Sequence, residues 1–202
     1  MPSEAYRSGN AVERRHLYSI AEQVAQVMQF EAHSVLEIGV GNGAAAAMMR
    51  SLGRKVTTVD INPSLNPDIC ADFRNLDWDS MGTFDVTLCC EVLEHLPFHD
   101  FRGSIQRFRS ISPILVLSLP CVRRFFGVAG LISLPPIYKQ YKAVGVRLPV
   151  GRGVPDYHCW ELDSCSETRM RRVLSMVESS YSNVTTYRSP VNPYHQFFLC
   201  RA

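Results

Sequence analysis

The stretch VLEIGVGNG, residues 35–43, decides the fold, because an apolar run typical of a buried strand leads directly into a glycine-rich turn. Glycines at alternate positions let the backbone turn tightly and leave its N–H groups open to a ligand. Four alanines then begin a helix, and Asp60 follows a second apolar run, seventeen residues after Gly43. An acidic residue there is placed to accept hydrogen bonds from a ribose. The pattern predicts a strand–turn–helix unit that holds a nucleotide-like cofactor.

Apolar runs alternate with helical patterns along the chain. We expect strands at 35–39, 56–60, 68–71, 85–90, 114–119, 184–187 and 196–200, and helices at 43–52, 98–110 and 163–179. The connection 60–84 holds two prolines and one weak strand, so we expect its crossover helix to be short or missing. The alternation predicts an α/β, Rossmann-like sheet of seven strands, mostly parallel with an antiparallel last strand, and helices on both faces.

The length and composition fit one domain. The chain has 202 residues, of which 46% are hydrophobic, and this is enough to bury a single core, so we expect one domain over 1–202. Apolar residues recur at helical spacing from about residue 11 to residue 30. We expect residues 1–30 to form a helical cap at the cofactor site.

The segment 121–157 differs in composition from the rest of the chain. It mixes aromatic and aliphatic residues with Arg123, Arg124, Lys139, Lys142, Arg147 and Arg152. Its many prolines and glycines argue against one long helix, so we expect an inserted lid or substrate-facing segment. Its apolar part indicates a hydrophobic acceptor or a peripheral membrane contact, and its basic part a grip on phosphate, an anionic glycan or a lipid head group. The alternatives are simple packing over the cleft and a solvated rim.

The charge and the cysteine content indicate the cellular compartment of the protein more clearly than its function. The net charge is only +2, so the overall balance does not favour nucleic acid. The seven cysteines are irregularly spaced, which fits reduced thiols better than a disulfide framework. The N-terminus lacks the apolar core of a secretory signal, and no segment reaches about 18 uninterrupted apolar residues. We therefore expect a cytoplasmic protein.

Four motifs resemble those of class I S-adenosylmethionine-dependent methyltransferases, in particular the type 11 and type 23 methyltransferase domains. They are Glu37-x-Gly39-x-Gly41-x-Gly43, Val59–Asn62, Ala71–Phe73 and Phe84–Pro97. The resemblance implies that the glycine turn lies against the methionine part of S-adenosylmethionine and that Asp60 holds the ribose. It also implies that Asp72 lies near the adenine amino group, with Ile61 and Phe73 beside the base. The expected cofactor-binding residues are Glu37, Gly39, Gly41, Gly43, Asp60, Ile61, Asp72, Phe73 and Cys90.

Two alternatives remain open at this point. Gly39, Gly41 and Ala44 also satisfy the looser dinucleotide pattern, so an NAD(P)-dependent oxidoreductase is the first. Glu37 and Gly43 favour the methyltransferase instead. The second alternative is a catalytically inactive scaffold that binds S-adenosylmethionine and serves a partner, because the sequence offers no unambiguous acid–base pair.

The end of the fourth expected strand faces the place where a methyl group would be transferred. Methyl transfer needs a positioned acceptor and a group that takes one proton, so we expect His95 or His158 to be the catalytic base. The alternative is that Glu91, Glu94 and His95 begin and cap the helix that follows.

The spacing Glu91-x-x-Glu94-His95 places two carboxylates and an imidazole about one helical turn apart, which suits a divalent cation. It is similar to a run in small-RNA 2′-O-methyltransferases and ubiquinone-pathway O-methyltransferases. That resemblance implies metal ligation by Glu91, Glu94 and His95, with His158 from the later stretch 156–161 as a fourth ligand. A divalent metal is the less favoured interpretation, because the same run occurs in methyltransferases that bind none.

The expected reaction is O-methylation of a small-molecule, glycan or lipid-like acceptor. A nucleic-acid acceptor is not favoured, because Cys89-Cys90-Glu91-Val92 does not match the Asn/Asp-Pro-Pro-aromatic motif of nucleic-acid amino-methyltransferases. No feature of the sequence bears on the oligomeric state.

Overall fold

The computed structural model describes residues 14–121, 123–132, 142–190 and 192–202, and in 14–15, 123–132 and 142–152 this description covers the backbone. The helices are α2 (Arg14–Met28), α3 (Ala44–Ser51), α4 (Phe101–Ile111) and α5 (Met170–Glu178). The strands are β1 (Ser34–Ile38), β2 (Lys55–Asp60), β3 (Ile69–Cys70), β4 (Val86–Cys90), β5 (Ile114–Pro120), β6 (Arg123–Ile132), β7 (Lys142–Arg152), β8 (Asn183–Arg188) and β9 (His195–Arg201).

Seven strands form the main sheet in the order β3-β2-β1-β4-β5-β9-β8. The first five strands are parallel to one another, β9 is antiparallel to β5, and β8 is antiparallel to β9. The predicted Rossmann-like sheet with an antiparallel last strand is therefore confirmed. Because β1, β2 and β4 are parallel neighbours, the residues that follow them meet at one edge of the sheet.

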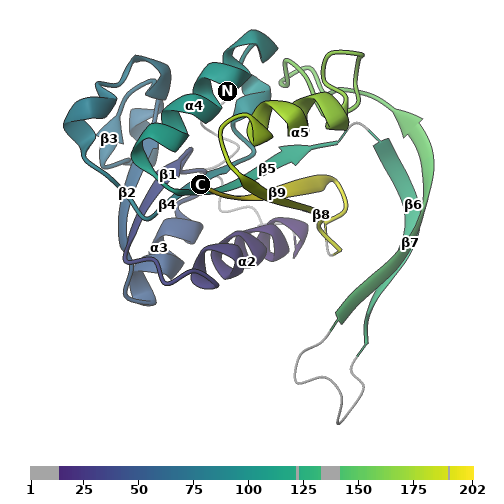
Figure 1. Cartoon of the computed structure of the whole chain (residues 1–202). Coiled ribbons are helices and arrows are strands. Elements are labelled where there is room, and N and C mark those ends of the chain that lie inside the picture. Colours follow the sequence, from purple (N-terminus) through teal and green to yellow (C-terminus); the bar gives the residue numbers. More distant parts are fainter. Residues whose placement is uncertain (1–13, 122, 133–141, 191) are drawn as a thin grey trace.

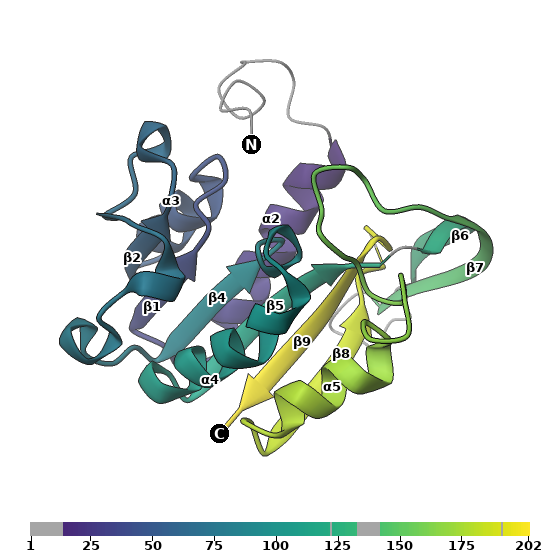
Figure 2. The ribbon, with the colours of Figure 1, turned by 90° about the horizontal axis from the view of Figure 1, so that it is seen from above.

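Helices cover both faces of this sheet, as predicted (Figures 1 and 2). α4 and α5 lie on one face, and α2 and α3 lie on the other. The α4–α5 side holds the larger cluster, which includes Phe101, Phe108 and Trp160, and the α2–α3 side holds a second one around Val27 and Met49. α2 thus packs as part of the core, and its expected role as a cap at the cofactor site stays a prediction, since residues 1–13 lie outside the described residues.

The connection between β2 and β4 lacks an α-helix, as the sequence predicts. It contains the short strand β3 and three 3-10 helices, Pro63–Leu65, Phe73–Asn75 and Trp78–Met81. The chain therefore returns from the carboxyl edge of the sheet to the start of β4 without an α-helix, and the backbone N of Asp85 donates to the backbone O of Ser34 at the start of β1. Along the described part of the chain, no helix combines the length and the apolar character needed to span a membrane.

The inserted segment forms an antiparallel two-stranded ribbon. β6 pairs with β7 from Arg123↔Arg152 to Ile132↔Lys142, and Figure 1 shows the ribbon projecting away from the main sheet. Its end at 133–141 lies outside the described residues. The role of a lid or substrate-facing segment stays a prediction for the ribbon, whereas the return of the chain through residues 154–162 reaches the carboxyl edge of the sheet.

Candidate functional site

The glycine turn after β1 has the backbone geometry that only glycine adopts easily. Gly39, Gly41 and Gly43 all have positive φ, at 83°, 56° and 76°. A Cβ at Gly39 would lie 2.4 Å from Cγ2 of Val92, so the chain after β4 passes too close for any side chain there. A Cβ at Gly41 would meet nothing within 4 Å. Gly39 therefore fixes the turn against the rest of the site, and Gly41 faces open space where a ligand can approach.

Asp60 ties this turn to the end of β2. Its Oδ2 accepts a hydrogen bond from the backbone N of Val40 at 2.9 Å, and its Oδ1 accepts one from the backbone N of Asn62 at 2.8 Å. Each carboxylate oxygen keeps a second lone pair, so the group can still accept from two hydroxyls. The next residue, Ile61, leaves 69% of its surface exposed, as expected of a side chain that covers a flat base.

Glu37 is a buried carboxylate below the turn. It is 4% exposed, and its Oε2 has no hydrogen-bond partner among the described residues. Burial raises the pKa of Glu37 to about 8, with smaller contributions from the surrounding charges. A positively charged ligand would offset the cost of ionising such a group. S-adenosylmethionine carries a sulfonium and an ammonium group, so Glu37, the open glycine turn and Asp60 fit that cofactor.

Two of the predicted cofactor residues are already engaged within the protein. The Asp72 carboxylate is held by the Arg74 guanidinium, 2.6 Å from Nη2 to Oδ2, and this pairing lowers the pKa of Asp72. Phe73 is 6% exposed, and its ring lies 5.6 Å from that of Phe108 in the core. The Phe73 ring thus packs in the core, and the expected place of Phe73 beside the base stays a prediction.

Cys90 and Glu91 end β4. Glu91 has a positive φ of 56°, which is unusual for a residue with a side chain. Its Oε1 accepts from Ser118 Oγ at 2.8 Å, and its Oε2 lies 3.4 Å from Nε2 of His195. Burial raises the pKa of Glu91 to about 7 and raises that of the Cys90 thiol well above its usual range. Its contacts with Ser118 of β5 and His195 of β9 thus hold the Glu91 carboxylate against these two strands.

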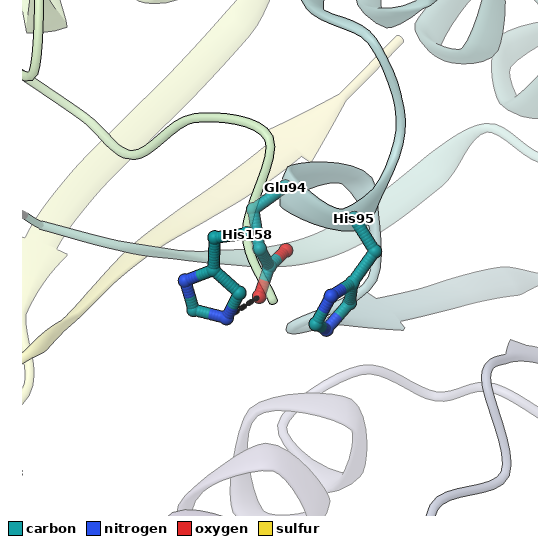
Figure 3. Close-up of side chains that lie close together, drawn as sticks. All are labelled: Glu94, His95 and His158. Carbon is teal, nitrogen blue, oxygen red and sulfur yellow. Dashed lines mark ion pairs between the residues drawn. The ribbon is translucent and has the colours of Figure 1, made fainter. Parts of the chain in front are cut away.

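Glu94, His95 and His158 point toward one another beside this strand end (Figure 3). One ligand atom from each lies within 4.8 Å of the others. Glu94 is fully buried, neither of its carboxylate oxygens has a hydrogen-bond partner among the described residues, and its Oε1 lies 3.9 Å from Nε2 of His158. Burial raises the pKa of Glu94 well above its usual range and lowers that of His95.

This arrangement differs from both interpretations of the Glu91–His95 run. The run contains the 3-10 helix Leu93–His95 and is followed by a second one, Phe98–Asp100, and no side chain from the run caps α4. The predicted four-ligand set is incomplete, because Glu91 does not join the other three. The remaining group combines two residues after β4 with one from a segment more than sixty residues later.

Each imidazole of the group is held through one ring nitrogen. Nδ1 of His95 lies 2.9 Å from the backbone oxygen of Tyr157, and Nδ1 of His158 lies 2.9 Å from Oε1 of Glu161. Glu161 is fully buried and also accepts a hydrogen bond from the Tyr194 hydroxyl. An Nδ1–H that donates to an oxygen leaves Nε2 of the same ring as a proton or metal acceptor.

Glu161 and Tyr194 are functional candidates that the sequence reasoning missed. The spacing His158-x-x-Glu161 is a signal that could have identified the first of them. Tyr194 could not be found in this way, because it reaches Glu161 from the loop before β9.

Comparison with known proteins places this chain in a family. Residues 12–161, about three quarters of the chain, match the family described as methyltransferase domain. The ubiquinone biosynthesis O-methyltransferase of Xanthomonas euvesicatoria is 31% identical over 90 residues. That match covers 38% of this chain and 38% of the relative, so the chain spans well under half of the curated relatives it matches.

Solved structures support the fold. The glycopeptide N-methyltransferase MtfA complexed with S-adenosylmethionine superposes with a TM-score of 0.58 and 12% identity, covering 90% of this chain and 93% of MtfA. N-methyltransferase NodS from Bradyrhizobium japonicum, in complex with S-adenosylhomocysteine, superposes with a TM-score of 0.58 and 11% identity, covering 93% of this chain and 87% of NodS. The family match decides against the nicotinamide-dependent oxidoreductase. The chain belongs to the methyltransferase domain family.

Proposed function

We propose that the protein transfers the methyl group of S-adenosylmethionine to a hydroxyl of a small-molecule, glycan or lipid-like acceptor. The glycine turn, Glu37, Asp60 and Ile61 would hold the cofactor. The acceptor would lie beside Glu94, His95 and His158, at the end of β4. Cys90, between these two groups, would border the cofactor.

The observation that supports methyl transfer to an oxygen atom is the pairing of His158 with Glu161. With Nδ1 donating to Glu161, Nε2 of His158 can take a proton from a hydroxyl. In an in-line displacement the acceptor oxygen bonds to the methyl carbon while the sulfur–carbon bond breaks, and the hydroxyl proton passes to His158. The ubiquinone biosynthesis O-methyltransferase also acts on oxygen by its name, and it supports the same choice.

The test is methyl transfer from labelled S-adenosylmethionine to a panel of phenols, sugars and long-chain lipid phenols, with products identified by mass spectrometry. The proposal predicts methyl ethers, and it predicts that His158→Ala lowers kcat at least about 100-fold while cofactor affinity is kept. Methylation of amines only would contradict the oxygen assignment. Cofactor binding without turnover on any acceptor would favour the scaffold.

A second proposal concerns a divalent cation held by Glu94, His95 and His158. It is supported by the two oxygens of buried Glu94, which accept no hydrogen bond from the described residues, and by the oxygen that holds each imidazole, an arrangement that orients metal-binding histidines. A cation there would supply Lewis-acid polarisation of the acceptor hydroxyl. Elemental analysis after dialysis against Mg²⁺, Mn²⁺ or Zn²⁺ tests this. Bound metal should be lost in Glu94→Gln and kept in Glu91→Gln, and retention in both would contradict the assignment.

A further inference from the structure

A groove of about 440 Å³ lies outside the cofactor and acceptor sites, between α4 and α5. The two helices lie side by side on one face of the sheet in both views (Figures 1 and 2). The groove is lined by four arginines, two serines and one methionine: Arg102, Arg169, Arg171, Arg172, Ser166, Ser175 and Met176. Arg102 belongs to the first turn of α4, and the other three arginines lie at the start of α5.

The four guanidinium groups are not neutralised by the protein. All four side chains are exposed, and within the described residues none of them forms an ion pair or a side-chain hydrogen bond. Two other described arginines form ion pairs, Arg50 with Asp68 and Arg74 with Asp72 and Asp100. The groove therefore differs from an ordinary mixed-charge surface.

No acidic residue is found among the described residues that line the groove. Asp163 accepts a hydrogen bond from the backbone N of Met170, but it is not part of the lining. Neither α4 nor α5 has an acidic residue in its first turn. Because Asp100 is the N-cap residue of α4 and Asp163 accepts from the first N–H of α5, we assign the positive charge of the groove to the four arginines and not to the helix dipoles. Like charges that line one groove repel one another, and a bound anion would relieve that repulsion.

We propose that this arginine groove binds the phosphate or diphosphate group of a small phosphorylated ligand. The planar guanidinium fork matches the spacing of phosphate oxygens and binds them with two parallel hydrogen bonds. The volume is that of a small-molecule site. A long polyanion fits less well, because the chain as a whole carries a net charge of only +2. The proposal does not depend on the methyl acceptor, and its test needs no turnover.

The direct test is calorimetric titration of the full-length protein with pyrophosphate at about 0.15 M salt, where screening suppresses non-specific attraction. Arg169→Glu and Arg172→Glu should each raise the Kd at least about tenfold, since each removes a charge-assisted pair. The matched control is Lys55→Glu, an exposed residue at the start of β2, which makes the same change in net charge and should alter the Kd less than twofold. Thermal melting of each variant separates lost binding from lost folding.

Two further probes identify the source of the phosphate. Flotation with vesicles of phosphatidic acid, against phosphatidylcholine vesicles, asks whether a lipid head group is recognised. Arginine-dependent binding of either pyrophosphate or phosphatidic acid supports the proposed phosphate site. The probe that binds more tightly shows whether the phosphate belongs to a small soluble ligand or to a lipid head group. The proposal is overturned if neither probe binds at millimolar concentration, if Lys55→Glu weakens binding as much as Arg169→Glu does, or if a short RNA binds far more tightly than both.

Discussion

Nδ1 of His158 lies 2.9 Å from Oε1 of Glu161, and both side chains are almost completely buried at the carboxyl edge of the sheet. The pair fixes which nitrogen of His158 faces Glu94. Because Tyr194 donates to the same carboxylate, two segments distant in sequence, 158–161 and the loop before β9, determine the orientation of one imidazole.

Glu161→Gln should therefore lower the rate of methyl transfer about 10- to 100-fold, as is usual when the partner of a functional histidine is changed. Affinity for S-adenosylmethionine should stay within about twofold, since the segment of Glu161 contacts the end of β5, and β4 lies between β5 and the strand β1 that leads into the glycine turn. Tyr194→Phe is the matched control, and its effect should be smaller because His158 keeps its partner. Single-turnover rates and calorimetry measure both quantities, and an equal loss of cofactor affinity would contradict the assignment.

Replacing Asp60 should weaken cofactor binding more than it affects folding. Asp60→Ala removes the expected ribose acceptor together with the acceptor for the backbone N of Val40, so the Kd for S-adenosylmethionine should rise at least about 30-fold. Asp60→Asn keeps one acceptor oxygen and should therefore lose less affinity for S-adenosylmethionine. Calorimetry gives the Kd values. Wild-type affinity in Asp60→Ala would show that the ribose lies elsewhere.

Gly39→Ala should lower the free energy of unfolding by at least about 2 kcal/mol, because a Cβ there combines a positive φ with a 2.4 Å contact to Val92. In the double variant Gly39→Ala/Val92→Ala the steric part should be relieved while the cost of the positive φ remains. Urea denaturation of the two single variants and the double variant measures this coupling. Strictly additive losses would mean that the close approach of Val92 has no energetic consequence.

The buried Glu37 carboxyl should make stability depend on pH. Its pKa is about 8 in the folded protein, against an ordinary value of 4.5, so the folded state keeps a proton that the unfolded chain loses. The free energy of unfolding should therefore fall as the pH rises from 4.5 to about 8, and the loss should be complete above that range. Glu37→Gln cannot ionise, so the difference between wild type and variant should shrink or reverse across this window. A pH-independent difference in urea midpoints would contradict the raised pKa.

The same group should couple cofactor binding to proton release. A cation bound near Glu37 favours the ionised carboxylate, so binding at about pH 7 should release a proton from wild type and none from Glu37→Gln. Calorimetry in two buffers of different ionisation enthalpy counts the protons. Equal release from both proteins would place the positive charge away from Glu37.

The sequence predicts the main sheet well, because buried parallel strands and the glycine turn have strong local patterns. It does not reveal the side-chain direction of Phe73, since an aromatic residue after β3 can face either the base or the core, and packing against Phe108 decides. It also predicts no helix in 121–157, but strand pairing between β6 and β7 depends on contacts across the chain. Tyr194 is missed for the same reason.

Native mass spectrometry of the purified protein tests the central claim most directly, because it detects the bound cofactor without knowledge of the acceptor. The account predicts a complex with the mass of one S-adenosylmethionine or S-adenosylhomocysteine, either co-purified or formed on addition, and its loss in Asp60→Ala. A nicotinamide dinucleotide at the same site would contradict it, as would the absence of any complex in millimolar S-adenosylmethionine.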